Sequence, residues 1–308
     1  MTFTASRHAD ATEFLAAAEP FLMEHEALHS MILGVARTQQ RQVMPRRRHL
    51  PLYLTVGSPT GPSLAALMSS SQKFLLAAEA PPHDEALAAL VSHLSNAGVS
   101  LPGVFGEEML AGRFASLWAA AAGCQPTPTF QQRLHKLTAA VLPPQPPIGQ
   151  LRPATVRESE LLAGWVLDFQ IEALPQEAGD LDSARIMVDG LLGRKDLYVW
   201  EAVDGDKTRV VSMAARARPT QRGIAINLVY TPPSERRRGY ATVLVAHLSR
   251  LLLDAGWQFC TLFTDQANAT ANSLYARIGY HPIADFIEYR FNRPAHLAGS
   301  FTSPGRLT

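Results

Sequence analysis

Short apolar runs alternate with amphipathic stretches throughout the second half of the chain. Runs of mainly apolar residues between turn signals predict strands, and apolar positions at helical spacing predict helices. The strands are expected at residues 149–154, 197–203, 210–217, 224–230, 259–264 and 282–291, and the helices at 158–174, 183–192, 239–255 and 268–278. The strand–helix–strand passage over 224–264 predicts a right-handed crossover between parallel neighbours. We therefore expect an α/β sheet, mostly antiparallel at its start and parallel in its middle.

The first half of the chain shows a fainter version of the same order. Helices are predicted at 13–35, 84–96 and 107–122, and strands at 50–56, 64–69, 74–78 and 99–105. This similarity favours a structural duplication, in which both halves are mixed α/β sheets flanked by helices. An unrelated α/β domain in the first half is the alternative.

Prolines mark the predicted domain boundary. Pro143, Pro144, Pro146 and Pro147 precede Gly149, and such a run forms a stiff, extended spacer because proline neither extends a helix nor donates to a sheet. The predicted organisation is a first domain at 1–142, a linker at 143–148, a second domain at 149–292 and a flexible tail at 293–308, which is rich in small and polar residues.

Composition narrows the class of protein. With 308 residues, 47% of them apolar, the chain is long enough for two domains that each bury a core. A net charge of +1 argues against a nucleic-acid binder or a protein held on an acidic membrane. Cys124 and Cys260 lie in apolar stretches without metal-ligand spacing, so we expect small core residues and no metal site. Without a signal-peptide pattern or a long apolar run, we expect a cytoplasmic protein.

An arginine-rich turn before the helix at 239–255 is the strongest local signal for a binding site. It reads Arg236-Arg237-Arg238-Gly239-Tyr240-Ala241. A helix start leaves backbone N–H groups without intrahelical partners and carries partial positive charge, and glycine allows close approach of a ligand. Such a place binds phosphate. The plainer interpretation is a turn whose arginines only solubilise the helix.

Three polar residues on the next helix support the first interpretation. Asn268, Asn272 and Tyr275 are spaced by four and three residues, which places them on one helix face. That face is expected to look across the C-terminal ends of the parallel strands, where α/β sheets bind ligands. Alternatively, Asn268 is an N-cap and Tyr275 is a core aromatic residue, although a capping role is compatible with ligand binding.

Taken together, these motifs resemble the GNAT superfamily of N-acetyltransferases. The resemblance covers residues 149–292 and rests on R-x-x-G-x-A, a following strand, N-x(6)-Y and the pair Gly279-Tyr280. It implies a sheet whose two central strands splay apart around acetyl-CoA. If the first half is a structural duplicate of the second, the resemblance implies a tandem GNAT-like protein. The cofactor-binding residues that we expect on this basis are Val229, Tyr230, Thr231, Arg236, Arg237, Arg238, Gly239, Tyr240, Ala241, Thr242, Asn268 and Asn272.

The resemblance also implies a reaction, in which a primary amine attacks acetyl-CoA directly. The departing thiolate needs a proton, and Tyr275 is the candidate acid. Members of the superfamily that use a glutamate five residues before the asparagine would have it where this chain has Phe263. The general base is therefore open among Glu172, Glu201, Glu288 and water.

The first half lacks the corresponding loop. Residues 79–85 read Glu-Ala-Pro-Pro-His-Asp-Glu, and two prolines without N–H groups beside three acids disfavour phosphate. We expect this half to be a degenerate GNAT-like domain that shapes the acceptor site or an interface. A non-catalytic acetyl-CoA sensor or scaffold is the alternative function. The expected partner is a small-molecule or peptide amine, and the chain is expected to be a monomer or a homodimer.

Overall fold

The computed structural model describes residues 2–41, 51–68, 73–79, 81–174 and 178–292 and divides the chain into two compact units. Unit 1 contains residues 1–25, 35–132 and 285–308, and unit 2 contains residues 26–34 and 133–284. The predicted tail at 293–308 lies outside the described residues. Within the described part, no helix has the length and apolar character needed to cross a bilayer.

Unit 1 is a mixed sheet with the strand order β1-β2-β3-β4-β5-β12. Its elements are β1 (Thr4–His8), α1 (Ala11–Glu24), β2 (Leu52–Ser58), β3 (Gly61–Met68), β4 (Phe74–Ala78), α3 (Asp84–Asn96), β5 (Gly103–Glu107) and α4 (Glu108–Ala122). Neighbouring strands from β1 to β4 are antiparallel, whereas β4 and β5 are parallel. Helices α3 and α4 bury their apolar faces against alternate residues of this sheet.

Unit 2 has the strand order β6-β11-β10-β9-β8-β7. Its elements are β7 (Gly149–Pro153), α5 (Ser159–Ala173), α6 (Leu181–Gly193), β8 (Leu197–Asp204), β9 (Lys207–Ala217), β10 (Gly223–Tyr230), α7 (Tyr240–Asp254), β11 (Phe259–Asp265) and α8 (Ala269–Ile278). The strands from β7 to β10 are antiparallel to their neighbours, and β10 is parallel to β11. The predicted helix between two parallel neighbours and the change from antiparallel to parallel pairing are confirmed.

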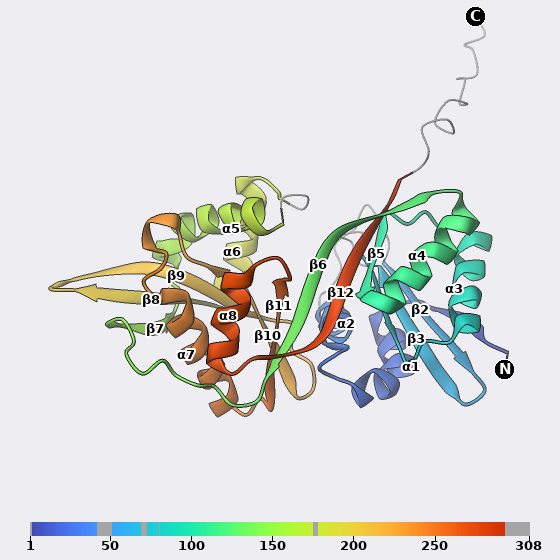
Figure 1. Ribbon diagram of the computed structural model, residues 1–308, viewed down its shortest axis with the longest axis horizontal. Helices are drawn as coiled ribbons and strands as arrows, with labels where there is room; N and C mark the ends of the chain where they lie inside the picture. Colours follow the sequence, from blue (N-terminus) through green and yellow to red (C-terminus); the bar gives the residue numbers. More distant parts are fainter. Residues whose placement is uncertain (1, 42–50, 69–72, 80, 175–177, 293–308) are drawn as a thin grey trace, which may run out of the picture. The chain divides into compact units, whose positions relative to one another are not determined.

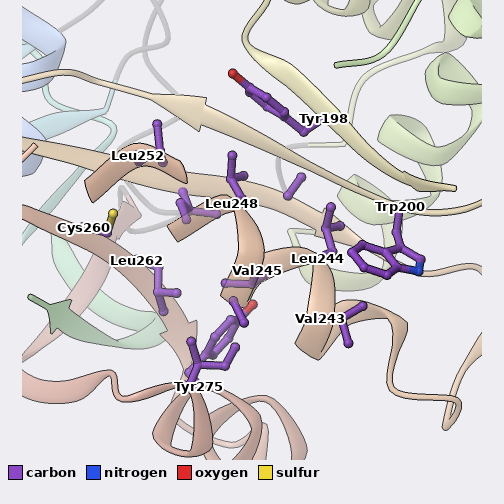
Figure 2. Packing of buried hydrophobic residues seen from close by; sticks show 14 of the residues in the cluster. Tyr198, Trp200, Val243, Leu244, Val245, Leu248, Leu252, Cys260, Leu262 and Tyr275 are labelled. Atoms are coloured by element: carbon purple, nitrogen blue, oxygen red, sulfur yellow. The ribbon is translucent and has the colours of Figure 1, made fainter. Parts of the chain in front are cut away.

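Two helical layers cover opposite faces of the sheet in unit 2. One apolar cluster joins α7 and α8 to Tyr198, Trp200 and Ile226, and Figure 2 shows part of it around Leu244 and Leu248. The other cluster joins α5 and α6 to strand residues that point to the opposite face of the sheet, such as Val199 and Met213. Because successive strand residues face opposite sides, β8 and β9 contribute buried apolar side chains to both helical layers.

Three elements pass from one unit to the other: α2 (Ser30–Arg41), β6 (Gln125–Leu137) and β12 (His281–Asn292). Their courses can be followed in Figure 1. The C-terminal part of β12 pairs antiparallel with β5, from Phe286 opposite Glu107 to Arg290 opposite Gly103. The end of the second sequence half therefore completes the sheet of unit 1.

These elements correct three expectations about chain organisation. The compact units divide within β6 and β12, so the proline-rich segment 143–148 is not where they separate. The predicted helix 13–35 is two helices, interrupted over residues 25–29. Strands β1 and β6 were not predicted at all. In β6, Pro126 and Pro128 and a mostly polar sequence conceal a strand in which only Leu134, His135 and Leu137, near the C-terminal end, are buried.

Candidate active site

The candidate site begins where β10 and β11 stop pairing. Their parallel register joins Gly223–Ala225 to Phe259–Thr261, which are the first three residues of each strand. On its other side β10 pairs with β9, but the register shifts between Asn227 and Tyr230. Leu228 at this irregularity has a φ of 50°, in the left-handed region that non-glycine residues seldom occupy. The sheet is therefore irregular in its centre, at the C-terminal end of β10.

The irregularity in β10 changes which face its side chains point to. Ile224 and Ile226 pack in the cluster with α7, whereas Leu228 and Tyr230 pack in the cluster with α5 and α6. A bulge inserts one residue and shifts the alternation by one position, leaving local backbone groups without sheet partners. Val229 returns to the α7 side. The expected acetyl-CoA contacts, Val229, Tyr230 and Thr231, thus follow directly on the bulge.

The turn between β10 and α7 is held by Glu235. Residues Pro233–Glu235 form a short 3₁₀ turn, and the nearly buried carboxylate of Glu235 accepts from Arg209 and lies 3.3 Å from Arg238 Nη1. Two residues of this turn are left-handed, Arg237 with φ 64° and Gly239 with φ 82°. Left-handed residues in such a turn bring successive N–H groups together into a concavity that suits an anion.

Helix α7 begins without a side-chain cap. Its N-cap is Gly239, which has no side chain to accept a hydrogen bond, and the helical bonding starts with Val243 N donating to Gly239 O at 3.1 Å. The N–H groups of Gly239, Tyr240, Ala241 and Thr242 therefore precede the helical ladder. By contrast, Asp10, Asp180 and Asn268 cap α1, α6 and α8 with side-chain oxygens. The start of α7 combines an uncapped helix end with its partial positive charge.

The three arginines before α7 have different surroundings. Arg236 turns toward α5, where its Nη2 lies 2.9 and 2.7 Å from the two carboxylate oxygens of Glu172, and its Nε donates to Thr231 O at 2.9 Å. Arg238 pairs with Glu235. Among the described residues, Arg237 has neither an ion pair nor a side-chain hydrogen bond, and its side chain is exposed. Arg236 and Arg238 thus shape the turn, and Arg237 is the arginine available to a bound phosphate.

Both asparagines of α8 have local hydrogen-bond partners. Asn268 Oδ1 accepts from Ala271 N at 2.9 Å and caps the helix. Asn272 Oδ1 accepts from the Thr264 hydroxyl at 2.6 Å, while its Nδ2 lies 3.3 Å from the carbonyl oxygens of Asp265 and Gln266. The capping interpretation of Asn268 is confirmed, and Asn272 ties α8 to the end of β11.

Tyr275 lies in the core between α8, β11 and α7. Its side chain is 8% exposed, and Figure 2 shows it beside Leu262 and Val245. Its ring meets that of Tyr280 edge to face with centroids 5.9 Å apart. Burial raises the pKa of the Tyr275 hydroxyl well above its usual value, so the group stays protonated at neutral pH but is a weaker acid than an exposed tyrosine. No hydrogen bond of this hydroxyl to another described residue is present.

The three glutamates considered as bases lie in different places. Glu201 on β8 accepts from Arg152 at 2.8 Å and from Gln150 at 2.9 Å, and the hydrogen bond from Arg152 lowers its pKa. Glu288 belongs to unit 1, where Lys73 Nζ lies 3.0 Å away. Glu172 is the candidate beside the end of β10, because Tyr230 Oη lies 3.4 Å from it.

Asp168 is a neighbour of this site that the sequence interpretation missed. It lies one turn before Glu172 on α5, and its carboxylate is also 3.4 Å from the Tyr230 hydroxyl. Burial, followed by the negative charges of Asp168 and Glu172, raises the pKa of Tyr230 to about 12. The i,i+4 spacing of the two acids was visible in the sequence, but nothing in it indicated that they face Tyr230.

Comparison with known proteins agrees with this geometry. Residues 206–290 match the FR47-like protein family, and no curated protein is similar in sequence at a significant level. A Drosophila protein of solved structure superposes with a TM-score of 0.66 at 14% identity, over 94% of this chain and 99% of that one. A GCN5-related N-acetyltransferase from Sphaerobacter thermophilus gives 0.59 at 16%, over 94% and 95%. A tandem GNAT protein from the clavulanic acid biosynthesis pathway gives 0.56 at 11%, over 95% and 99%.

The neighbours cover nearly the whole length of this chain, and the family match contains the β10 bulge, the uncapped start of α7 and the polar residues of α8. The chain has the fold of the tandem GNAT-type N-acetyltransferases, with an FR47-like segment at residues 206–290.

Proposed function

We propose that the protein transfers the acetyl group of acetyl-CoA to a primary amine. The observation that carries this proposal is the uncapped start of α7, with left-handed Arg237 and Gly239 before it, at the end of a bulged strand. The pyrophosphate of acetyl-CoA is the ligand that such a helix start would hold. The backbone of Val229, Tyr230 and Thr231 would bind the pantetheine arm, as the resemblance implies.

The chemistry requires three contributions from the chain. A neutral amine nitrogen attacks the thioester carbon, and the proton that the nitrogen loses passes to Glu172 or to water. Backbone N–H groups freed by the β10 bulge would stabilise the oxyanion. The carbon–sulfur bond then breaks, and Tyr275 would protonate the departing thiolate. The products are an N-acetyl amine and the free thiol of CoA.

A non-catalytic acetyl-CoA sensor or scaffold is the second candidate. The apolar Phe263 at the position of a possible catalytic glutamate favours it, and so does the sequence of residues 79–85 in the first half, whose prolines and acids disfavour phosphate. The same proposal includes three expectations. The acceptor is a small-molecule or peptide amine, the protein is a monomer or a homodimer, and it is located in the cytoplasm.

Calorimetric titration with acetyl-CoA and a thiol-release assay test the proposal together. The assay would use a panel of small amines and peptide N-termini. We expect saturable binding and release of CoA thiol with at least one acceptor class. Binding without release on any acceptor would favour the sensor, and absence of binding would reject both candidates.

A further inference from the structure

A buried chain of hydrogen bonds connects β6, β11 and α8 in unit 2. His135 on β6 is 3% exposed, and its Nε2 lies 3.1 Å from the hydroxyl of Thr264. Thr264, at the end of β11, is 4% exposed and donates to Asn272 Oδ1 at 2.6 Å. Asn272 in turn donates through Nδ2 toward two backbone carbonyls of the β11–α8 loop. We call His135, Thr264 and Asn272 the relay.

The direction of each bond in the relay follows from the donors that are present. Asn272 Nδ2 faces two carbonyl oxygens, which only accept, so the Oδ1 of the amide faces Thr264. The single hydroxyl hydrogen of Thr264 is therefore used toward Asn272. Toward His135 the Thr264 oxygen can therefore only accept a hydrogen bond, so His135 Nε2 must carry the hydrogen. Loss of the Thr264 hydroxyl therefore removes two buried hydrogen bonds, one to His135 and one to Asn272.

The relay ends on the loop that carries the candidate cofactor contacts of α8. The carbonyl oxygens of Asp265 and Gln266 receive Asn272 Nδ2, and Asn268 follows directly as the cap of the helix. Tyr275 lies two turns further along the same helix. His135, about a hundred residues before the arginine-rich turn in the sequence, is thus connected to this loop through Thr264.

We propose that His135 and Thr264 are positioning residues that hold the loop 265–268 and the first turn of α8 in the geometry that binds acetyl-CoA. This inference rests on the proposed function. It also assigns Asn272 a role different from direct contact with the cofactor, because its amide atoms are used within the relay. Pre-set loop geometry lowers the ordering cost of binding without altering the chemical step.

The test replaces Thr264 in the full-length protein. Thr264→Val keeps the shape but removes the hydroxyl, and Thr264→Ser restores it. We expect Thr264→Val to raise the KM for acetyl-CoA about fivefold or more, with kcat at saturation within about twofold, and Thr264→Ser to return KM to the wild-type value. His135→Leu should reproduce the effect, whereas His135→Gln, which keeps an N–H donor, should reduce it. Thr261→Val, at another buried threonine of β11, is the matched control.

Amide hydrogen exchange of residues 265–271 in the free protein separates this inference from the proposed function. Exchange there should quicken in Thr264→Val and return to normal in Thr264→Ser. Unchanged exchange and unchanged KM in Thr264→Val would overturn the relay, and so would a fall in melting temperature that Thr264→Ser rescues without any change in KM. Quickened exchange in a protein whose wild type does not bind acetyl-CoA would instead overturn the function.

Discussion

Both units contain a strand–helix–strand motif with parallel strands, but the residues at the start of the helix differ in charge and backbone geometry. In unit 2, β10 leads through a glycine at φ 82° into α7, which has no side-chain cap and no acidic residue in its first turn. In unit 1, β4 leads into α3, which follows Pro81 and Pro82 and carries Asp84 and Glu85 in its first turn. Helix α3, like α7, has no side-chain cap, but its two first-turn acids place negative charge at the positive end of the helix. Topology therefore provides a helix start, but the residues before it decide whether an anion can bind.

The next helix in each unit repeats the contrast. Tyr275 is seven residues beyond Asn268, the N-cap of α8. Seven residues beyond Glu107, the N-cap of α4, lies Phe114, which is fully buried against Phe74 and Trp118. A carboxylate and a phenyl ring thus stand where unit 2 has an amide and a phenol. Helix α4 therefore keeps an aromatic ring in the core but has no phenol hydroxyl at that position, and its N-cap is an acid instead of an amide.

The largest difference between the units should appear in binding stoichiometry. We expect one acetyl-CoA per chain, because the prolines and acids before α3 offer the pyrophosphate few N–H groups and repel its charge. Residue 80 of this turn lies outside the described residues. Calorimetric titration of the full-length protein measures the ratio directly. A value of two would show that unit 1 also binds the cofactor and would remove the contrast.

Replacing Tyr275 by phenylalanine gives α8 the ring that α4 already has. If Tyr275 is the acid, kcat should fall by about 10²–10⁴-fold, with little change in acetyl-CoA affinity because the ring still packs. Steady-state kinetics and a thermal melt of the variant check this expectation.

Tyr280→Phe is the control for Tyr275→Phe. The Tyr280 hydroxyl lies 2.9 Å from Ser249 Oγ in the same core, so its loss should lower stability by about 1 kcal/mol and leave kcat intact. A fully active Tyr275→Phe enzyme would assign the proton to water.

A side chain at Gly239 should weaken the site of unit 2. An added Cβ meets only Pro147 Cδ, at 3.8 Å, so the free protein has room for it. Valine would nevertheless crowd a bound pyrophosphate and strain the left-handed backbone. We expect Gly239→Val to reduce acetyl-CoA affinity at least about tenfold, or about 1.4 kcal/mol.

Gly98→Val in unit 1 separates backbone strain from loss of binding. Gly98 has φ 63° and no atom within 4 Å of an added Cβ, so its substitution should strain the backbone without touching the site. Calorimetry on both folded variants makes the comparison. Equal affinities would place the phosphate elsewhere.

The smallest expected effect concerns Glu107, the counterpart of Asn268. Burial raises the pKa of its carboxyl, so deprotonation opposes folding, and stability is lost as the pH rises from the unfolded pKa through the folded one. Glu107→Gln should therefore raise the melting temperature at pH 7, by an amount equivalent to about 0.5 kcal/mol. Well below pH 4, where Glu107 is protonated in both the folded and the unfolded state, the difference should vanish. Melting curves of both proteins at the two pH values decide, and a gain that is equal at both would contradict the explanation.

Much of unit 2 was determined by local sequence. The apolar periodicity of β8, β9, β10 and α7 placed these elements within a few residues, because each buries one face in a thick core. Gly239 indicated the start of α7, and Gly279, with φ 107°, indicated the end of α8. The parallel pairing of β10 and β11 followed from the helix between them, since a short turn cannot join parallel strands.

Long-range contacts decided what the sequence left open. β6 is a strand because it pairs with β11, and its own prolines and polar residues give no such signal. The proline run near Gly149 looked like a boundary, yet the units divide within β6 and β12. Likewise, the tertiary structure decides that Asn272 bonds to Thr264 and that Asp168 lies beside the Tyr230 hydroxyl. Local residues determine helices, turns and uncapped ends, whereas pairing between distant segments, which depends on the whole chain, decides which side chains meet.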